Sequence, residues 1–258
     1  MMNLHTTGTG PPILLVHGLG GAWQSWEPIL ADLAKHRMVH AIDLPGHGLS
    51  PVAPGADTFA GLADALGEEI VARGWTGLPM VGSSLGGRLV LEMARRGLSG
   101  DVVALDPGGF WKGWERTFFA TTIGASVKLL QTLGGALSGM AKNPVSRSAL
   151  LAQLSARPWA LDGRVVADEL ARYARTATVP ALIADLAKGP MQRGPAAPGT
   201  GQVTIGWGRH DRLCLSQQAH RAMAAFPGAM LHWFEHSGHF PFWDEPAEAV
   251  RVILEGTS

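Results

Sequence analysis

The chain is poor in cysteine and has no excess of charge, and both absences limit what it can be. Its one cysteine, Cys214, has no second cysteine with which to form a disulfide bond within the chain. This usage fits a protein of a reducing compartment, because stable disulfides belong mainly to oxidising ones. The 21 Lys and Arg residues balance the 21 Asp and Glu residues. The composition therefore gives no support to nucleic-acid binding, which favours a strongly basic surface.

Long hydrophobic runs are also missing. The apolar stretch Ile13 to Val16 is far too short to cross a bilayer, which takes about 18 or more apolar residues. Residues Met1 to Pro12 are polar and lack the basic start and apolar stretch of a signal peptide. Hydrophobic residues nevertheless make up 46% of the chain, which is enough for a sizeable core and unlike a disordered chain. We expect a cytoplasmic globular protein with no membrane contact.

Short apolar runs alternate with segments of helical periodicity along the 258 residues. The predicted strands are Pro12 to Val16, Met38 to Ile42, Leu78 to Ser83, Asp101 to Asp106, Gln202 to Trp207 and Met230 to Phe234. The predicted helices are Trp23 to Ala34, Phe59 to Val71, Leu85 to Ala94, Gln217 to Ala225 and Pro246 to Leu254. Such alternation favours parallel pairing through crossover connections. We therefore predict an α/β fold in which helices flank a mostly parallel central sheet.

The alternation stops between residues 107 and 197, where no run is typical of a strand. Short helical segments separated by glycine and proline fill this stretch. Because strands of the same sheet resume after it, we predict an insertion rather than an independent domain. Residues 1–106 and 198–258 then form the core, and residues 107–197 form a helical cap. The segment Pro190 to Gly201, rich in Pro, Gly and Ala, is the expected hinge or return linker.

The sequence Gly-Ser-Ser-Leu-Gly, from Gly82 to Gly86, marks the junction of a predicted strand and a predicted helix. A Gly-x-Ser-x-Gly pattern in that position is typical of a nucleophile elbow, a sharp turn that exposes the hydroxyl of the central serine. Glycines two residues to either side remove Cβ atoms that would clash in so tight a turn. Only Ser84 has glycines at both positions, so Ser84 rather than Ser83 is the candidate nucleophile.

A serine hydroxyl needs a base within hydrogen-bond reach, and that base needs an orienting group. In a parallel sheet, such groups are expected on loops at the carboxyl ends of the strands. His239 follows the last predicted strand and fits the base, and Asp211 follows the strand before it and fits the acid. The order Ser84, Asp211, His239 is the one expected when an elbow supplies the nucleophile.

Four segments together resemble the α/β-hydrolase superfamily, over essentially the whole length of the chain. They are His17-Gly18, Asp43 to Ser50 (Asp-Leu-Pro-Gly-His-Gly-Leu-Ser), Gly82 to Gly86, and Gly238-His239. The pattern is similar to small carboxylesterases, pimeloyl-carrier-protein methyl ester esterases and carbon–carbon bond hydrolases. The resemblance implies a cap inserted between strands six and seven of the family, reduced or missing first strands, and no organic cofactor.

The resemblance also implies two oxyanion donors and an alternative acid. The backbone N–H groups of Leu19 and Leu85 would hold the negative oxygen that develops in acyl transfer. Some relatives place the acid after the strand that precedes the cap, where this chain has Asp106. Asp106 is therefore the alternative to Asp211.

Aromatic residues in the cap and near the predicted catalytic loops indicate an apolar acyl or alkyl group in the substrate. The candidate substrate-binding residues are Trp23, Trp111, Trp114 and Phe240. His236 lies three residues before His239, but no further cluster has the ligand spacing of a metal site, so no metal is predicted.

The cap region is basic within a neutral chain. Residues 107–193 hold 11 Lys or Arg residues against 5 Asp or Glu residues. Such a surface could steer an acidic carrier protein or an anionic ester toward the site, although solvated helix surface is the simpler explanation.

These observations together predict a lidded serine hydrolase, a carboxylesterase that acts on short or medium acyl esters through an acyl-enzyme. Carbon–carbon hydrolysis, thioester cleavage, lactone opening and perhydrolysis use similar catalytic groups and stay open. A non-catalytic ligand-binding receptor on the same scaffold is an alternative of another class, since a fold alone does not settle function.

Overall fold

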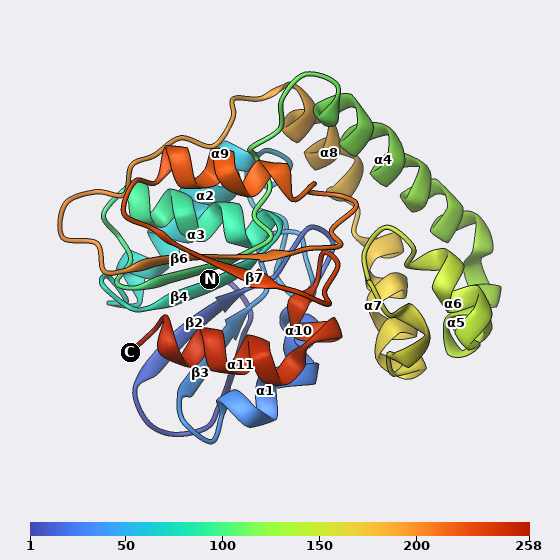
Figure 1. Cartoon of the computed structure of the whole chain (residues 1–258), viewed down its shortest axis with the longest axis horizontal. Helices are drawn as coiled ribbons and strands as arrows, with labels where there is room; N and C mark the ends of the chain where they lie inside the picture. The colour runs from blue at the N-terminus through green and yellow to red at the C-terminus, as the bar shows by residue number, and fades with distance from the viewer.

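A seven-stranded sheet runs through the centre of the computed structural model, which describes residues 1–258 (Figure 1). The strands are β1 (Leu4–Thr7), β2 (Pro12–Val16), β3 (Met38–Ile42), β4 (Met80–Ser83), β5 (Val102–Leu105), β6 (Val203–Gly208) and β7 (Met230–Phe234). They lie in the order β1-β3-β2-β4-β5-β6-β7, and only the β1–β3 pairing is antiparallel. The predicted mostly parallel sheet is confirmed.

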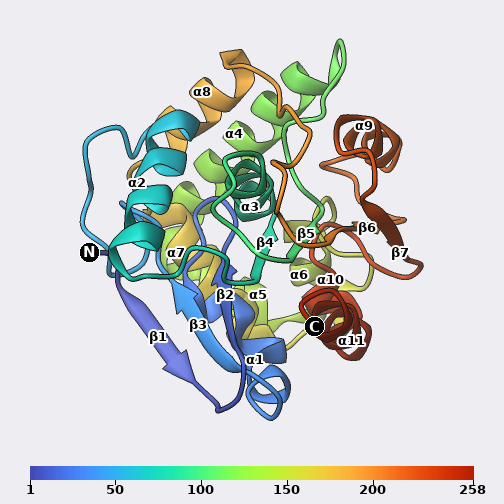
Figure 2. The ribbon, with the colours of Figure 1, turned by 90° about the vertical axis from the view of Figure 1, so that its left-hand side faces the viewer.

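Helices cover both faces of this sheet, as Figure 2 shows. The helices on one face are α2 (Phe59–Ala72), α3 (Leu85–Arg95) and α9 (Gln217–Ala225). Those on the other face are α1 (Glu27–Leu33), α11 (Pro246–Glu255) and the short α10 (Pro241–Asp244). None of the helices combines the length and hydrophobicity that a membrane-spanning helix needs.

Strand β2 shows why the sheet has two cores. Successive side chains of a strand point to opposite faces. Accordingly, Leu14 and Val16 belong to the core under α2 and α3, whereas Ile13 and Leu15 belong to the core under α1 and α11. All four are fully buried. A continuous apolar run is therefore what this central strand requires.

Two local differences from the expected elements have simple causes. The predicted helix Trp23 to Ala34 is divided into a 3-10 turn, η1 (Trp23–Trp26), and α1, because Pro28 lies at the start of the α-helix, where its missing N–H costs nothing. The sequence analysis missed β1, an edge strand of four mostly polar residues that lacks an apolar pattern.

Five helices and two 3-10 turns lie between β5 and β6, without any strand (Figure 1). They are α4 (Glu115–Leu133), η2 (Gly134–Ala136), α5 (Leu137–Lys142), α6 (Pro144–Leu150), η3 (Pro158–Ala160), α7 (Gly163–Arg175) and α8 (Val179–Lys188). We call this group of helices the cap. The cap therefore lies between the fifth and sixth strands of this chain.

Candidate active site

Ser84 occupies the sharp turn between β4 and α3. Its backbone has φ 56° and ψ −112°, in the region that residues other than glycine rarely adopt. The flanking glycines are required by space: a Cβ on Gly82 would lie 2.2 Å from the carbonyl oxygen of Gly86, and a Cβ on Gly86 would lie 2.1 Å from that of Val16. The elbow predicted from the sequence thus exists as a strained turn.

The side chains of Ser84, His239 and Asp211 form a continuous hydrogen-bonded chain. His239 Nε2 lies 2.8 Å from Ser84 Oγ, and His239 Nδ1 lies 2.7 Å from Asp211 Oδ2. The other Asp211 oxygen accepts the backbone N–H groups of Leu213 and Cys214 at 2.7 and 2.9 Å. This network assigns the ring proton to Nδ1, where it donates to the carboxylate, and leaves Nε2 to accept from the serine hydroxyl.

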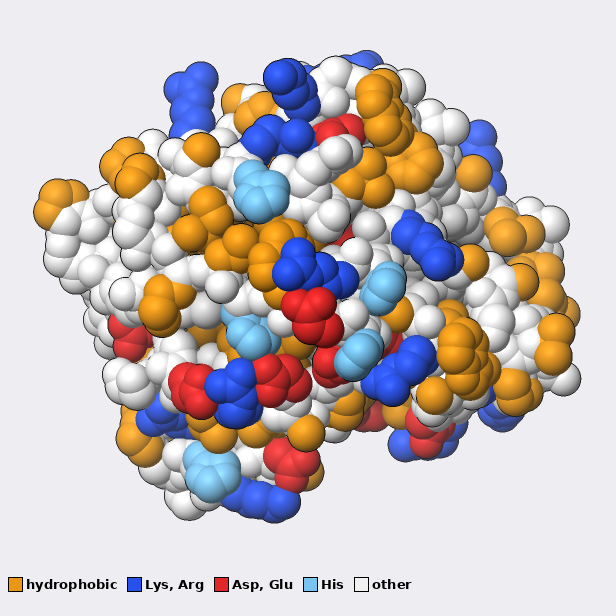
Figure 3. Space-filling model, viewed as in Figure 1, with side chains coloured by type: hydrophobic (Ala, Val, Ile, Leu, Met, Phe, Trp, Pro, Cys, Tyr) orange, Lys and Arg blue, Asp and Glu red, His pale blue; other side chains and the backbone are white.

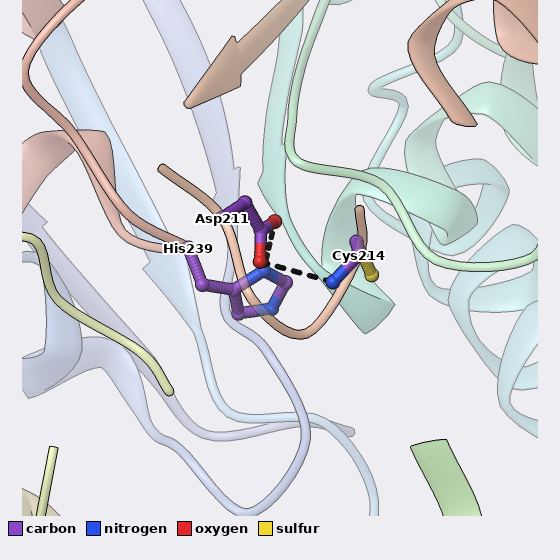
Figure 4. A group of neighbouring side chains, drawn as sticks. All are labelled: Asp211, Cys214 and His239. Atoms are coloured by element: carbon purple, nitrogen blue, oxygen red, sulfur yellow. Dashed lines mark hydrogen bonds and ion pairs between the residues drawn. The ribbon is translucent and has the colours of Figure 1, made fainter. Parts of the chain in front are cut away.

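Asp211 lies between the His239 ring and the backbone N–H of Cys214, as Figure 4 shows. The ligand-type atoms of Asp211, His239 and Cys214 all lie within 4.8 Å of one another. Burial raises the pKa of the Cys214 thiol well above its usual range, and the Asp211 charge raises it further. Hydrogen bonds within the protein already engage Asp211 and His239 of this cluster.

Asp106, the alternative acid, lies behind Asp211 and does not contact the base. Its Oδ1 accepts the backbone N–H of Gly208 at 2.8 Å, whereas its buried Oδ2 finds no donor in the protein. Burial raises the pKa of Asp106 well above its usual range, and the negative charge of Asp211 raises it further. A protonated Asp106 carboxyl would have Asp211 as its acceptor. The geometry favours Asp211 as the partner of His239.

The loop after β2 approaches the nucleophile closely and is held by a buried histidine. His17 Nδ1 donates to the carbonyl oxygen of Gly18 at 2.7 Å, and His17 Nε2 accepts the backbone N–H of Leu44 at 3.0 Å. Burial lowers the pKa of His17 to about 3, so the ring stays neutral in this role. A Cβ on Gly18 would lie 3.3 Å from the Cβ of Ser84.

The backbone N–H groups of Leu19 and Leu85 have no acceptor within the protein. Leu19 lies in the loop just described and donates to no backbone oxygen. Leu85 is the first residue of α3, where N–H groups have no partner within the helix. Both residues line the same cavity as Ser84. Two free donors beside a serine are the arrangement that stabilises an oxyanion.

The comparisons with known proteins place this fold and these motifs in one family. The model of the alpha/beta hydrolase family matches residues 13–252. The chain belongs to the alpha/beta hydrolase family. The family and the hydrolase names among the relatives support hydrolase activity.

Two characterised relatives match this hydrolase over nearly its whole length. A pimeloyl-[acyl-carrier protein] methyl ester esterase of Chromobacterium violaceum is 27% identical over 98% of both chains. A 2-hydroxy-6-oxo-2,4-heptadienoate hydrolase of Pseudomonas putida is 27% identical over 97% of this chain and 90% of its own. The crystal structure of an esterase from Exiguobacterium antarcticum superposes with a TM-score of 0.76 at 16% identity, covering 98% of this chain and 94% of that one, which shows a shared fold.

A cavity of about 230 Å³ separates the cap of this hydrolase from its core and reaches Ser84 and His239. Most of its lining side chains are hydrophobic, and they come from α4, α6 and α7 as well as from the core loops. The predicted Trp111 and Phe240 line it. The cavity therefore offers mostly apolar surroundings beside the serine.

Trp23 and Trp114 were expected in the pocket, and the structure corrects both positions. Trp114 is 62% exposed and packs edge-on against Phe118 at the surface of the cap. Trp23 stacks on the ring of His5 from β1, with ring centroids 3.8 Å apart. Neither lines the cavity.

Sequence analysis missed two charged residues in the cavity wall, Arg88 and Glu169. Arg88 lies on α3 four residues after Ser84 and also lines the cavity. Residues four apart lie on the same helix face, so this spacing was the signal that could have identified it.

Proposed function

We propose that this hydrolase is a serine carboxylesterase that cleaves esters with an apolar acyl or alkyl group. The observation that carries the proposal is the position of the His239 ring, hydrogen-bonded to Ser84 through Nε2 and to Asp211 through Nδ1. A neutral imidazole held in this tautomer is the base that a serine nucleophile requires.

The chemistry follows from these positions. Ser84 Oγ attacks the ester carbonyl carbon while His239 Nε2 accepts its proton, and Asp211 stabilises the resulting imidazolium. The carbonyl oxygen becomes an oxyanion that accepts the free N–H groups of Leu19 and Leu85. The C–O bond then breaks, and the alcohol leaves with the proton from His239. Water, deprotonated by His239, attacks the carbonyl carbon of the acyl-enzyme. The bond to Ser84 Oγ then breaks, the carboxylic acid leaves, and His239 returns the proton to Ser84 Oγ.

Carbon–carbon hydrolysis is the second candidate, supported by the relative that acts on 2-hydroxy-6-oxo-2,4-heptadienoate. Thioester cleavage, lactone opening and perhydrolysis would use the same catalytic groups. If the protein is instead a non-catalytic receptor, it should bind a ligand without turning it over.

We also propose that the cap binds an acidic carrier protein. The support is the named carrier-protein substrate of one relative, together with exposed cap cations such as Lys128, Lys142 and Arg164. Figure 3 shows basic and hydrophobic side chains side by side on the visible face of the molecule. If charge guides an anionic substrate, kcat/KM for an anionic ester should fall with added salt and in Lys128→Glu, whereas a neutral ester should be unaffected.

A panel of esters, varied separately in the acyl and alcohol parts, tests the proposal. We expect turnover of p-nitrophenyl butyrate and of longer apolar acyl esters, and none with Ser84→Ala. The same panel includes a thioester, a lactone and a vinylogous 1,5-diketone. Preference for the diketone would favour carbon–carbon hydrolysis, and absence of all turnover would favour the receptor.

A further inference from the structure

The wall of the substrate cavity contains a buried arginine that the ester mechanism does not use. Arg88 is 2% exposed, lies one turn after the nucleophile on α3, and lines the cavity with Ser84. Burial lowers the pKa of Arg88 to about 10, so the guanidinium remains charged near neutral pH. The other charged lining residue, Glu169 of α7, is paired with Arg172, and most of the remaining lining is apolar. Arg88 is therefore the charged lining residue without an ion pair.

No carboxylate of the protein forms an ion pair with Arg88. The nearby acids are already occupied: Glu92 pairs with Arg95 and Arg96. Asp185 accepts the backbone N–H of Phe59 at 2.8 Å. Asp185 and Glu92 attract Arg88 electrostatically, but no carboxylate contacts its guanidinium directly.

The hydrogen bonds of Arg88 go only to neutral oxygens. Nη2 donates to the carbonyl oxygen of Pro190 at 2.6 Å, and Nε donates to the side chain of Gln192 at 3.3 Å. The ring of Phe59 lies 3.8 Å from the guanidinium carbon. Nη1 donates to no acceptor in the protein, although a guanidinium carries five N–H donors. These contacts fix the group in place and leave donors unused.

A buried charge without an ion-pair partner is costly, and such groups concentrate at functional sites. We propose that Arg88 binds an anionic group of the substrate, so that the preferred ester carries a carboxylate in addition to its reactive bond. A carboxylate matches the planar guanidinium fork better than a single neutral acceptor does. This inference rests on the proposed ester hydrolysis and names the substrate class of that site.

Binding to the inert Ser84→Ala variant tests the inference without turnover. Isothermal titration calorimetry compares the monomethyl and dimethyl esters of the same straight-chain dicarboxylic acid, over a series of chain lengths. We expect the monoester to bind about 10- to 100-fold more tightly at the best length, as for one charge-assisted pair. A second arm uses butyrate esters of hydroxy acids, which place the carboxylate on the alcohol side. Preference in either arm supports the inference and identifies the side of the substrate.

Variants of Arg88 then test whether this residue causes the preference for the carboxylate-bearing ester. Adding Arg88→Met to Ser84→Ala should abolish it, and Arg88→Lys should retain a part, because lysine keeps the charge without the fork. Arg251→Met, an equal change at an exposed position of α11, should leave the preference unchanged. Thermal melting checks that each variant folds. The comparison of charged and neutral esters in Ser84→Ala alone does not depend on any variant of Arg88.

Equal affinity of Ser84→Ala for the charged and neutral esters in both arms would overturn the inference. So would a preference that persists in a folded Arg88→Met variant. If the wild type hydrolyses no ester while Ser84→Ala still selects the carboxylate through Arg88, the proposed function fails and the anion site stands.

Discussion

The backbone N–H of His239 donates a hydrogen bond to the carbonyl oxygen of Leu154 in the cap, at 2.8 Å. The loop that carries the candidate base is therefore attached directly to the segment between α6 and η3. The same cap residue also lines the substrate cavity. The position of His239 is therefore linked to the position of the cap.

Asp244, a buried residue of α10, reinforces this attachment. Its carboxylate accepts the hydroxyl of Ser155 at 2.5 Å and the backbone N–H groups of Ala156 and Gly238 at 2.8 Å each. We predict that Asp244→Ala destabilises the protein by about 1–3 kcal/mol, because it leaves buried donors unpaired. It should also lower kcat for p-nitrophenyl butyrate more than it changes KM. Lower stability with an unchanged kcat would show that Asp244 does not position His239.

The two neighbouring acids should differ sharply in their effect on catalysis. Asp211→Asn should lower kcat on the order of 10⁴-fold, because an amide does not stabilise the imidazolium or hold its tautomer. Asp106→Asn should lower kcat far less, because Asp106 has no contact with His239 and an amide N–H can still donate toward Asp211. A larger loss of kcat in Asp106→Asn would reverse the assignment of the acid.

His17 should make the folded protein sensitive to acid. Burial lowers its pKa from 6.5 to about 3. Between these two pH values, the ring is protonated in the unfolded chain and neutral in the folded protein. The free energy of unfolding therefore decreases as the pH falls through this window. Urea titrations should give a shallower pH dependence for His17→Gln than for the wild type, and an unchanged one for the exposed His36→Gln. Equal slopes in all three would contradict the buried, neutral ring.

We predict that a glycine flanking Ser84 does not tolerate a larger residue, whereas a glycine with open space around it does. Gly86→Ala should severely destabilise the fold, because its Cβ would lie 2.1 Å from the backbone oxygen of Val16. Gly124 in α4 has open space around it, so Gly124→Ala should be neutral or stabilising by up to about 1 kcal/mol. Thermal melting of the two variants checks this, and a Gly86→Ala protein as stable as the wild type would contradict the turn geometry.

The sheet and the order of the candidate residues could be predicted because both depend on local patterns. The apolar run of β2, the glycines around Ser84 and the positions of Asp211 and His239 after strands are visible in the sequence itself. The predicted fold is confirmed, and the structure brings the three side chains together.

The cavity wall could not be predicted in the same way. Trp111 and Trp114 are three residues apart and equally aromatic, yet one lines the cavity and the other is exposed, because the packing of the cap decides which side each faces. The four-residue spacing from Ser84 indicates the helix face of Arg88 but not its burial. Its burial beside Phe59 and Pro190 depends on segments distant in the chain.

The central claim is that Ser84 is a nucleophile activated by His239. The most direct test is reaction with a serine-directed fluorophosphonate, followed by peptide mass spectrometry. We predict one adduct, on Ser84, that forms far more slowly in His239→Ala. An unlabelled protein, or a label on another residue, would contradict the account.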